Sequence, residues 1–130
     1  MQTILLVDDS PTIRRMVRAA LGALPGIGFT EAGSELQAIE TLAMQRVQMI
    51  VLDLNMPDMH GLEVLRFLRS QEQYRELPVM VLTTRGDETS RDAALQAGAS
   101  AYMTKPFSPS VLVSSVRELL KPTAVPPQQT

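Results

Sequence analysis

Three carboxylates, a hydroxyl and an amine each follow a short apolar segment of this sequence. They are Asp8 and Asp9 after residues 4–7, Asp53 after residues 50–52, Thr83 after residues 79–82, and Lys105 after residues 101–104. Like charges held close together resist joint ionisation, so three neighbouring carboxylates need a cation among them. A hard divalent ion such as Mg²⁺ prefers oxygen ligands, and no histidine or cysteine stands beside these carboxylates.

With a cation in place, the central carboxylate could act as the nucleophile toward a phosphoryl group and form an aspartyl phosphate. Asp53 is the best candidate for this role. Phosphoryl transfer depends on alignment and on neutralising the equatorial oxygens, which a metal ion, Lys105 and Thr83 would provide. The residues therefore predict a Mg²⁺-dependent phosphoacceptor site.

The rest of the sequence alternates short apolar runs with amphipathic stretches, as repeated βα units around a parallel sheet do. Five such units can be counted. Central strands are predicted at residues 4–7, 50–52 and 79–82, where apolar residues follow one another, and weaker edge strands at 27–32 and 101–104. Right-handed crossovers bring the carboxyl ends of parallel strands to one edge, where open α/β folds bind ligands. The five polar side chains should therefore share one small depression.

Apolar spacing and capping residues predict a helix after each strand. Ser10-Pro11 begins the first, and Ser34 with Gln37 resembles a capping box that begins the second. The predicted apolar faces are Ile13, Met16, Val17, Ala20, Leu21 and Leu24 in the first helix, Leu36, Ile39 and Leu42 in the second, Leu62, Leu65 and Leu68 in the third, and Leu112, Val116, Leu119 and Leu120 in the fifth. The fourth, about residues 88–97, has a core face mostly of alanine and ends at Gly98, a natural left-handed cap, so we expect it to be the least firmly anchored.

Together these motifs resemble the receiver family of two-component response regulators, CheY-like receivers especially. The resemblance covers about residues 1–120. It rests on the acidic pair in LLVDDS, the segment VLDLNMPDMHGLE, the strand end VLTT and the segment AYMTKPF, all in this order. It implies an α/β fold, namely a doubly wound (βα)5 flavodoxin-like sandwich with a five-stranded parallel sheet of order 2-1-3-4-5.

The resemblance also implies a role for individual residues. Asp53 would be the phosphoacceptor, Asp9 a direct Mg²⁺ ligand, Asp8 a water-mediated ligand and Asn55 a ligand through its backbone carbonyl. The phosphoryl donor would be a sensor histidine kinase or a histidine phosphotransfer protein, because the sequence has no visible ATP site. A small donor such as acetyl phosphate is the alternative. The domain would signal rather than act as an enzyme, with at most self-phosphorylation and self-dephosphorylation activity.

A conformational switch is implied as well. In the family the hydroxyl corresponding to Thr83 moves to bond the phosphoryl oxygens, and the aromatic ring corresponding to Tyr102 swings inward. The affected surface would be the fourth helix, fifth strand and fifth helix, which would bind a downstream effector protein or an appended output domain. The peptide bond between Lys105 and Pro106 would be cis.

Each residue alone also has an ordinary structural explanation. Asp8 and Asp9 could favour the start of a helix, Asp53 could begin a turn, and Lys105 could be a solvated loop residue.

A phosphatase of the haloacid dehalogenase type also uses an aspartate and Mg²⁺, but it places its nucleophile after the first strand and has a second aspartate where this sequence has Asn55. A nucleotide- or flavin-binding domain is disfavoured, because the sequence contains no glycine-rich phosphate-binding motif. An interaction module that is never phosphorylated would keep the fold, and the intact set of site residues argues against it.

Composition narrows the setting. A chain of 130 residues with 45% hydrophobic content can bury one core, and we place one domain at residues 1–121 and a tail or linker at 122–130. The absence of cysteine excludes disulfides and thiolate metal sites. A net charge of −2 gives no general attraction to nucleic acid, and no window approaches the length of a membrane span. We expect a cytoplasmic domain that contacts neither nucleic acid nor membrane directly and is a monomer or weak dimer.

Five more side chains could modify the predicted site. His60, the one histidine, is interpreted as a solvated loop residue, and Arg85 lies where it could alter the lifetime of an acyl phosphate. Arg14, Arg15 and Arg18 are interpreted as a solvated face of the first helix, with kinase docking as the alternative.

Overall fold

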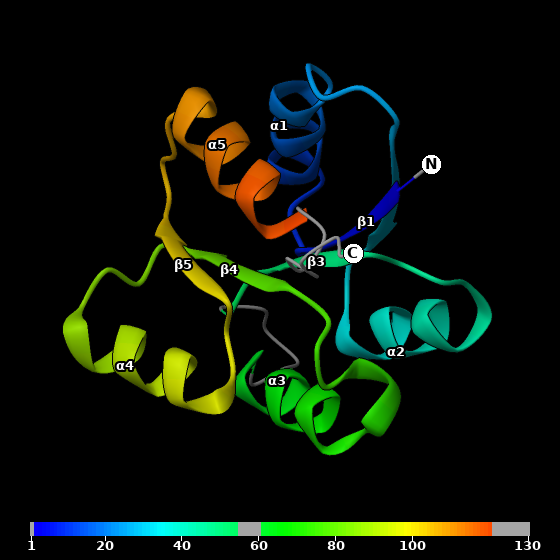
Figure 1. Cartoon of the computed structure of the whole chain (residues 1–130). Coiled ribbons are helices and arrows are strands. Elements are labelled where there is room, and N and C mark those ends of the chain that lie inside the picture. The colour runs from blue at the N-terminus through cyan, green and yellow to red at the C-terminus, as the bar shows by residue number, and fades with distance from the viewer. Residues whose placement is uncertain (1, 55–60, 121–130) are drawn as a thin grey trace, which may run out of the picture.

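Five parallel strands form the sheet at the centre of the molecule, in the order β2-β1-β3-β4-β5 (Figure 1). The computed structural model describes residues 2–54 and 61–120. Its strands are β1 (Gln2–Val7), β2 (Ile27–Ala32), β3 (Met49–Leu52), β4 (Val79–Thr83) and β5 (Ala101–Thr104); its helices are α1 (Pro11–Leu21), α2 (Glu35–Met44), α3 (Gly61–Ser70), the short 3-10 helix η1 (Glu72–Tyr74), α4 (Glu88–Ala97) and α5 (Pro109–Leu120). None of the helices in the described ranges is long and apolar enough to cross a membrane. The order and the edge positions of β2 and β5 confirm the predicted flavodoxin-like fold.

Helices cover both faces of the sheet, α1 and α5 on one side and α2, α3 and α4 on the other (Figure 1). The core is therefore split into two layers. Val17 and Leu112 belong to the layer under α1 and α5, whereas Leu42, Leu65 and Ala94 belong to the layer under the other three helices. Burial on both faces explains why β1, β3 and β4 are apolar on successive residues rather than on alternate ones.

The register of the strands brings their carboxyl ends to one edge. Val7 at the end of β1 pairs with Leu52 at the end of β3. Thr83 at the end of β4 pairs with Thr104 at the end of β5. The polar residues that follow these strands are consequently delivered to the same side of the molecule.

The helix boundaries follow their predicted caps. Ser10 and Ser34 are the N-caps of α1 and α2. The hydroxyl of each serine accepts a hydrogen bond of 3.2 Å from the backbone N–H three residues later. Gly98 ends α4 in the left-handed region with φ of 114°, which glycine adopts without the steric cost that a Cβ adds. The predicted capping box differs in one detail, because the side chain of Gln37 accepts from the N–H of Gly33 at 2.7 Å rather than from that of Ser34.

Two predicted core residues are instead exposed. Met16 on α1 is 48% exposed and Leu36 on α2 is 66% exposed. On α2 the buried positions are Ala38 and Leu42, and Leu36 lies about 200° around the helix from Ala38 at 3.6 residues per turn. A spacing of three or four residues fits both the predicted face, Leu36, Ile39 and Leu42, and the observed buried pair, Ala38 and Leu42. The face that packs on the sheet is the one that contains the small alanine.

Candidate functional site

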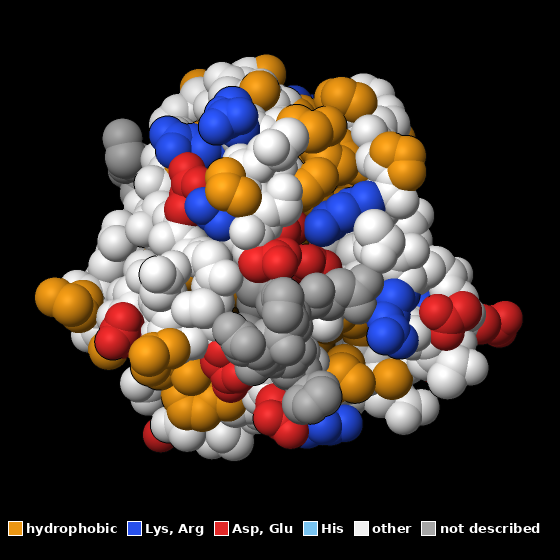
Figure 2. Space-filling model, turned by 180° about the vertical axis from the view of Figure 1, so that it is seen from behind, with side chains coloured by type: hydrophobic (Ala, Val, Ile, Leu, Met, Phe, Trp, Pro, Cys, Tyr) orange, Lys and Arg blue, Asp and Glu red, His pale blue; other side chains and the backbone are white. Residues whose placement is uncertain are grey.

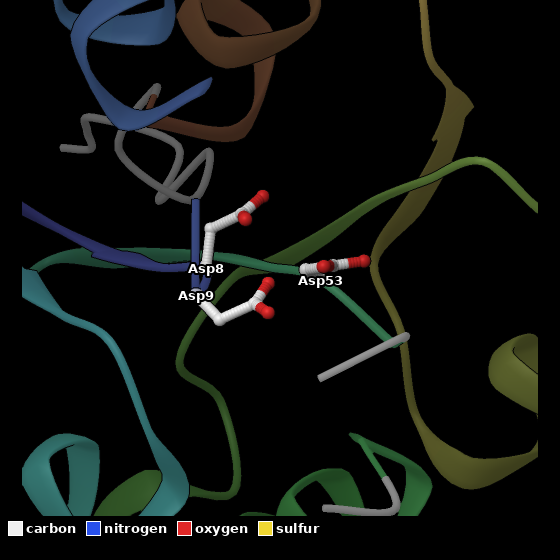
Figure 3. A group of neighbouring side chains, drawn as sticks. All are labelled: Asp8, Asp9 and Asp53. Carbon is white, nitrogen blue, oxygen red and sulfur yellow. The ribbon is translucent and has the colours of Figure 1, made fainter. Parts of the chain in front are cut away.

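The carboxyl groups of Asp8, Asp9 and Asp53 meet at the ends of β1 and β3 (Figure 3). One carboxylate oxygen of each lies within 4.8 Å of the others. The backbone sets this proximity, since the N–H of Asp53 donates to the carbonyl oxygen of Val7 at 2.9 Å and so continues the pairing of the two strands. The three carboxylates that the sequence predicted to share one depression are therefore neighbours.

Lys105 brings a positive charge to this cluster. Its Nζ lies 2.8 Å from Asp8 Oδ2 and 3.5 Å from Asp53 Oδ2. The side chains of the three residues are 11%, 8% and 4% exposed, so these charges interact with little screening by solvent. In the space-filling view, acidic side chains gather near the middle of one face with basic side chains on both flanks (Figure 2).

The carboxylates of Asp8 and Asp9 differ in their hydrogen bonding and in their exposure to solvent. Asp8 accepts from the N–H of Ser10 at 2.9 Å through one carboxylate oxygen and from Lys105 through the other. Asp9 is exposed at the rim. The carboxylate of Asp9 is thus better placed to bind an ion from solvent, while that of Asp8 is held by Ser10, which precedes α1, and by Lys105, which follows β5.

The donor set suits a hard divalent cation. All three candidate ligands offer oxygen, and two of them are buried. One ammonium group offsets one of the three negative charges, which leaves an excess that a divalent ion would balance. Oxygen-only sites of this kind fit Mg²⁺ or Mn²⁺ rather than the metals that favour imidazole or thiolate.

Thr83 is fully buried at the carboxyl end of β4, the strand next to the one that precedes Asp53. Its Oγ1 accepts a hydrogen bond of 3.4 Å from the N–H of Arg85. The N–H of Lys105 donates to the carbonyl oxygen of Thr83 at 2.8 Å, so the backbone ties the two predicted catalytic positions together.

Tyr102 is half-buried on β5, and its hydroxyl donates a hydrogen bond to the backbone carbonyl oxygen of Arg85. Burial raises the pKa of the Tyr102 hydroxyl, and the negative charge of Asp87 adds to the effect. The two residues of the predicted switch pair are therefore connected through the backbone of Arg85, a residue that the sequence suggested for a different reason.

Some predicted positions stand apart from this description. Asn55 and His60 lie outside the described residues. The peptide bond between Lys105 and Pro106 is cis, the isomer that the resemblance implied.

The sequence missed a network on α1. Arg14 was interpreted as solvated, yet its side chain is 17% exposed, and its Nε donates to Glu31 Oε1 at 2.7 Å. Arg14 Nη1 also donates to the backbone carbonyl oxygen of Asp8. Arg18 binds the second oxygen of Glu31 and lies over the ring of Phe29, 5.5 Å from its centroid. Hydrogen bonds from the two arginines hold the pKa of the Glu31 carboxyl below its ordinary value, that from Arg14 contributing most.

The comparisons with known proteins agree with this geometry. The model of the response regulator receiver domain matches residues 4–117. The chemotaxis protein CheY homolog of Campylobacter jejuni is 35% identical over 118 residues, which are 90% of this chain and 91% of that protein. The probable transcriptional regulatory protein TcrX of Mycobacterium tuberculosis is 43% identical over 95% of this chain, which spans 51% of that protein. The structure of chemotaxis protein CheY4 of Vibrio cholerae aligns with a TM-score of 0.84 at 32% identity, covering 92% of this chain and 99% of that one.

Proposed function

This chain belongs to the response regulator receiver family of two-component signalling proteins, and we propose that it accepts a phosphoryl group on the carboxylate of Asp53. The observation that carries the proposal is the meeting of Asp8, Asp9, Asp53 and Lys105 at one edge of the sheet. Scattered carboxylates would have ordinary structural roles, whereas this cluster combines a buried nucleophile with the charges that phosphoryl transfer requires.

In the proposed reaction a carboxylate oxygen of Asp53 attacks the phosphorus of a phosphohistidine on a partner protein. The new O–P bond forms as the N–P bond breaks, and the imidazole nitrogen keeps the electron pair of that bond. The product is an acyl phosphate on Asp53. With acetyl phosphate as donor, the P–O bond breaks instead and acetate leaves.

Mg²⁺ would be held by the carboxylates of Asp9 and Asp53, by Asp8 through water, and by the backbone carbonyl of Asn55. When bound, it neutralises negative charge on the transferring group and its neighbours. The hydrogen bonds of Asp8 to Ser10 and Lys105 support its indirect role, because both of its oxygens already accept from the protein.

Lys105 and Thr83 would stabilise the phosphoryl group, Lys105 by its charge and Thr83 by its hydroxyl. Lys105 already bridges Asp8 and Asp53, so it needs to move little to reach an oxygen of the new phosphoryl group. The hydroxyl of Thr83 would leave its weak bond with the N–H of Arg85 to do the same. The ring of Tyr102 would then move together with the loop that carries Arg85, and this movement would complete the switch.

The signal would be read on the surface formed by α4, β5 and α5. The expected donor is a sensor histidine kinase or a histidine phosphotransfer protein, and the expected recipient is an effector protein or an appended output domain. The domain would span residues 1–121 with a tail or linker at 122–130, act in the cytoplasm as a monomer or weak dimer, and have at most self-phosphorylation and self-dephosphorylation activity.

The test is incubation with acetyl phosphate and Mg²⁺, followed by intact-protein mass spectrometry. The wild type should gain the mass of one phosphoryl group, and Asp53→Asn should not. Asp92→Asn, the same chemical change at an exposed position of α4, is the matched control and should still be modified. Modification that persists in Asp53→Asn would remove Asp53 from this role.

A further inference from the structure

Arg14 of α1 contacts the peptide that joins two of the acidic residues. Its Nη1 donates a hydrogen bond of 2.5 Å to the backbone carbonyl oxygen of Asp8, which belongs to the peptide between Asp8 and Asp9. On its other side, Arg14 Nε donates to Glu31 Oε1 at 2.7 Å. The guanidinium is therefore held between β2 and the end of β1, and its side chain is only 17% exposed.

We propose that Arg14 is a positioning residue for divalent-cation binding, because it fixes the direction in which the side chain of Asp9 projects from the backbone. The orientation of a peptide plane sets ψ of the residue before it and φ of the residue after it. Holding the carbonyl of Asp8 thus restrains the Asp9 backbone, and with it the carboxylate of Asp9. The inference rests on the proposed function, since it concerns how that site receives its cation.

Asp9 needs this restraint more than its neighbours do. The carboxylate of Asp8 is already fixed by Ser10 and Lys105, and Asp53 is buried. Asp9 is exposed, so packing restrains the orientation of its carboxylate less. Removal of a group that orients a metal ligand lowers metal affinity or activity, with losses on the order of 10- to 100-fold.

The turn between β2 and α2 leaves room for the guanidinium. A Cβ added at Gly33 would lie 3.3 Å from Arg14 Nη1 and 4.0 Å from the carbonyl oxygen of Asp8. Any larger residue would therefore press on the hydrogen bond between Arg14 and Asp8. The lack of a side chain at Gly33 is part of the same arrangement.

Electrostatics and positioning predict opposite results, which makes the proposal testable. Arg14 carries a positive charge close to a cation site, so its removal alone should strengthen cation binding slightly. Removing the same charge from Arg18, one turn further along α1 and bound to the same carboxylate, should do likewise. Weaker binding in the Arg14 variant can therefore not come from charge.

The experiment measures Mg²⁺ affinity by calorimetry, and Mn²⁺ affinity by electron paramagnetic resonance, on the unphosphorylated full chain. Arg14→Met should weaken binding by about tenfold. Arg18→Met, the matched control, should change affinity by less than about twofold, and toward tighter binding. Gly33→Ala keeps every charge but crowds the guanidinium, so it should weaken binding in the same direction as Arg14→Met, by a smaller factor.

The outcomes separate the inference from the proposed function. A wild-type chain that binds neither ion would overturn the proposed metal site itself. A wild type that binds, together with an Arg14→Met variant of equal or higher affinity, would overturn only the positioning role. Equal weakening in Arg14→Met and Arg18→Met would also overturn it, because the loss would then follow from the Glu31 ion pairs rather than from the Asp8 carbonyl. If Arg14→Met does not fold, Gly33→Ala decides by the same criterion.

Discussion

The hydroxyl of Tyr102 donates a hydrogen bond to the backbone carbonyl oxygen of Arg85. The N–H of Arg85 in turn donates to the buried Oγ1 of Thr83. Arg85, in the loop between β4 and α4, thus joins the two residues of the proposed switch pair. This loop leads directly to Asp87, whose side chain caps α4 by accepting from the N–H of Ser90 at 3.0 Å. A change at either end of this connection can therefore reach the start of α4.

Tyr102→Phe should loosen this loop. The substitution keeps the ring and removes only the hydrogen bond to the carbonyl of Arg85, so we expect a loss of about 0.5–1.5 kcal/mol in the free energy of unfolding. Hydrogen exchange should become faster at the amides of residues 84–88.

Tyr74→Phe is the matched control for this variant, because the hydroxyl of Tyr74 also donates to a backbone carbonyl, that of Leu42, at 3.1 Å. It should cost a similar free energy without accelerating exchange at residues 84–88. Unchanged exchange in Tyr102→Phe would mean that the hydroxyl does not restrain the loop.

Alkaline pH should destabilise the protein partly through Tyr102. Burial and the charge of Asp87 raise the pKa of this hydroxyl above its ordinary value of about 10. The folded state therefore favours the neutral form, and the stabilising contribution is complete below about pH 10 and is lost as the pH rises through the folded pKa. Urea unfolding followed from about pH 9 upward should show this decline in the wild type.

The Tyr102→Phe variant should show a shallower decline over the same pH range. The difference between the tyrosinate absorbance titrations of wild type and variant isolates Tyr102. A difference titration centred at or below the ordinary tyrosine pKa would contradict the raised value.

The sequence predicted the strands and the acidic site because both depend on patterns that are local. Three runs in which apolar residues follow one another identify strands covered on both faces, and the position of Asp53 immediately after one of them places it at the binding edge. Contacts between elements are a different matter. Nothing in the spacing of α1 indicates that Arg14 turns toward Glu31, 17 positions away on β2, or that Leu36 faces solvent while Ala38 packs on the sheet.

Arg69 is another residue whose role emerges only from tertiary structure. Its Nε and Nη2 donate to the carbonyl oxygen of Gly98 at 3.0 and 2.8 Å, and its Nη1 donates to that of Tyr74 at 2.8 Å. It therefore ties α3 to the end of α4. The contact is close, since a Cβ at Gly98 would lie 2.6 Å from Arg69 Cγ.

Arg69→Met should lower the free energy of unfolding by about 1–3 kcal/mol, because it leaves two partly buried carbonyls without these donors. Arg66→Met, at an exposed position of the same helix, should change it by less than about 0.5 kcal/mol. Urea unfolding measures both. Equal effects in the two variants would show that Arg69 contributes no more than an ordinary surface arginine.

Lys105→Met tests the charge balance of the site. The substitution removes the ammonium that lies 2.8 Å from Asp8 and 3.5 Å from Asp53, and it keeps most of the apolar stem. Two buried carboxylates then repel each other without this cation, so we expect a loss of about 3 kcal/mol in the free energy of unfolding in a chelating buffer. Asp8→Asn in the same chain should restore part of that loss, because it removes one of the two uncompensated charges.

Magnesium should reduce the effect of Lys105→Met. An ion that binds only the folded state stabilises it by RT ln(1 + [Mg²⁺]/Kd), about 2.7 kcal/mol at a hundred times Kd. A chain that lacks Lys105 has more unbalanced negative charge, so it should gain more from the ion than the wild type does. Urea unfolding with and without Mg²⁺ measures this difference, and Arg91→Met controls for the loss of a surface cation. If Lys105→Met lost the same free energy in both buffers, the ion would not be binding where Lys105 meets the carboxylates, and the cation site would have to lie elsewhere.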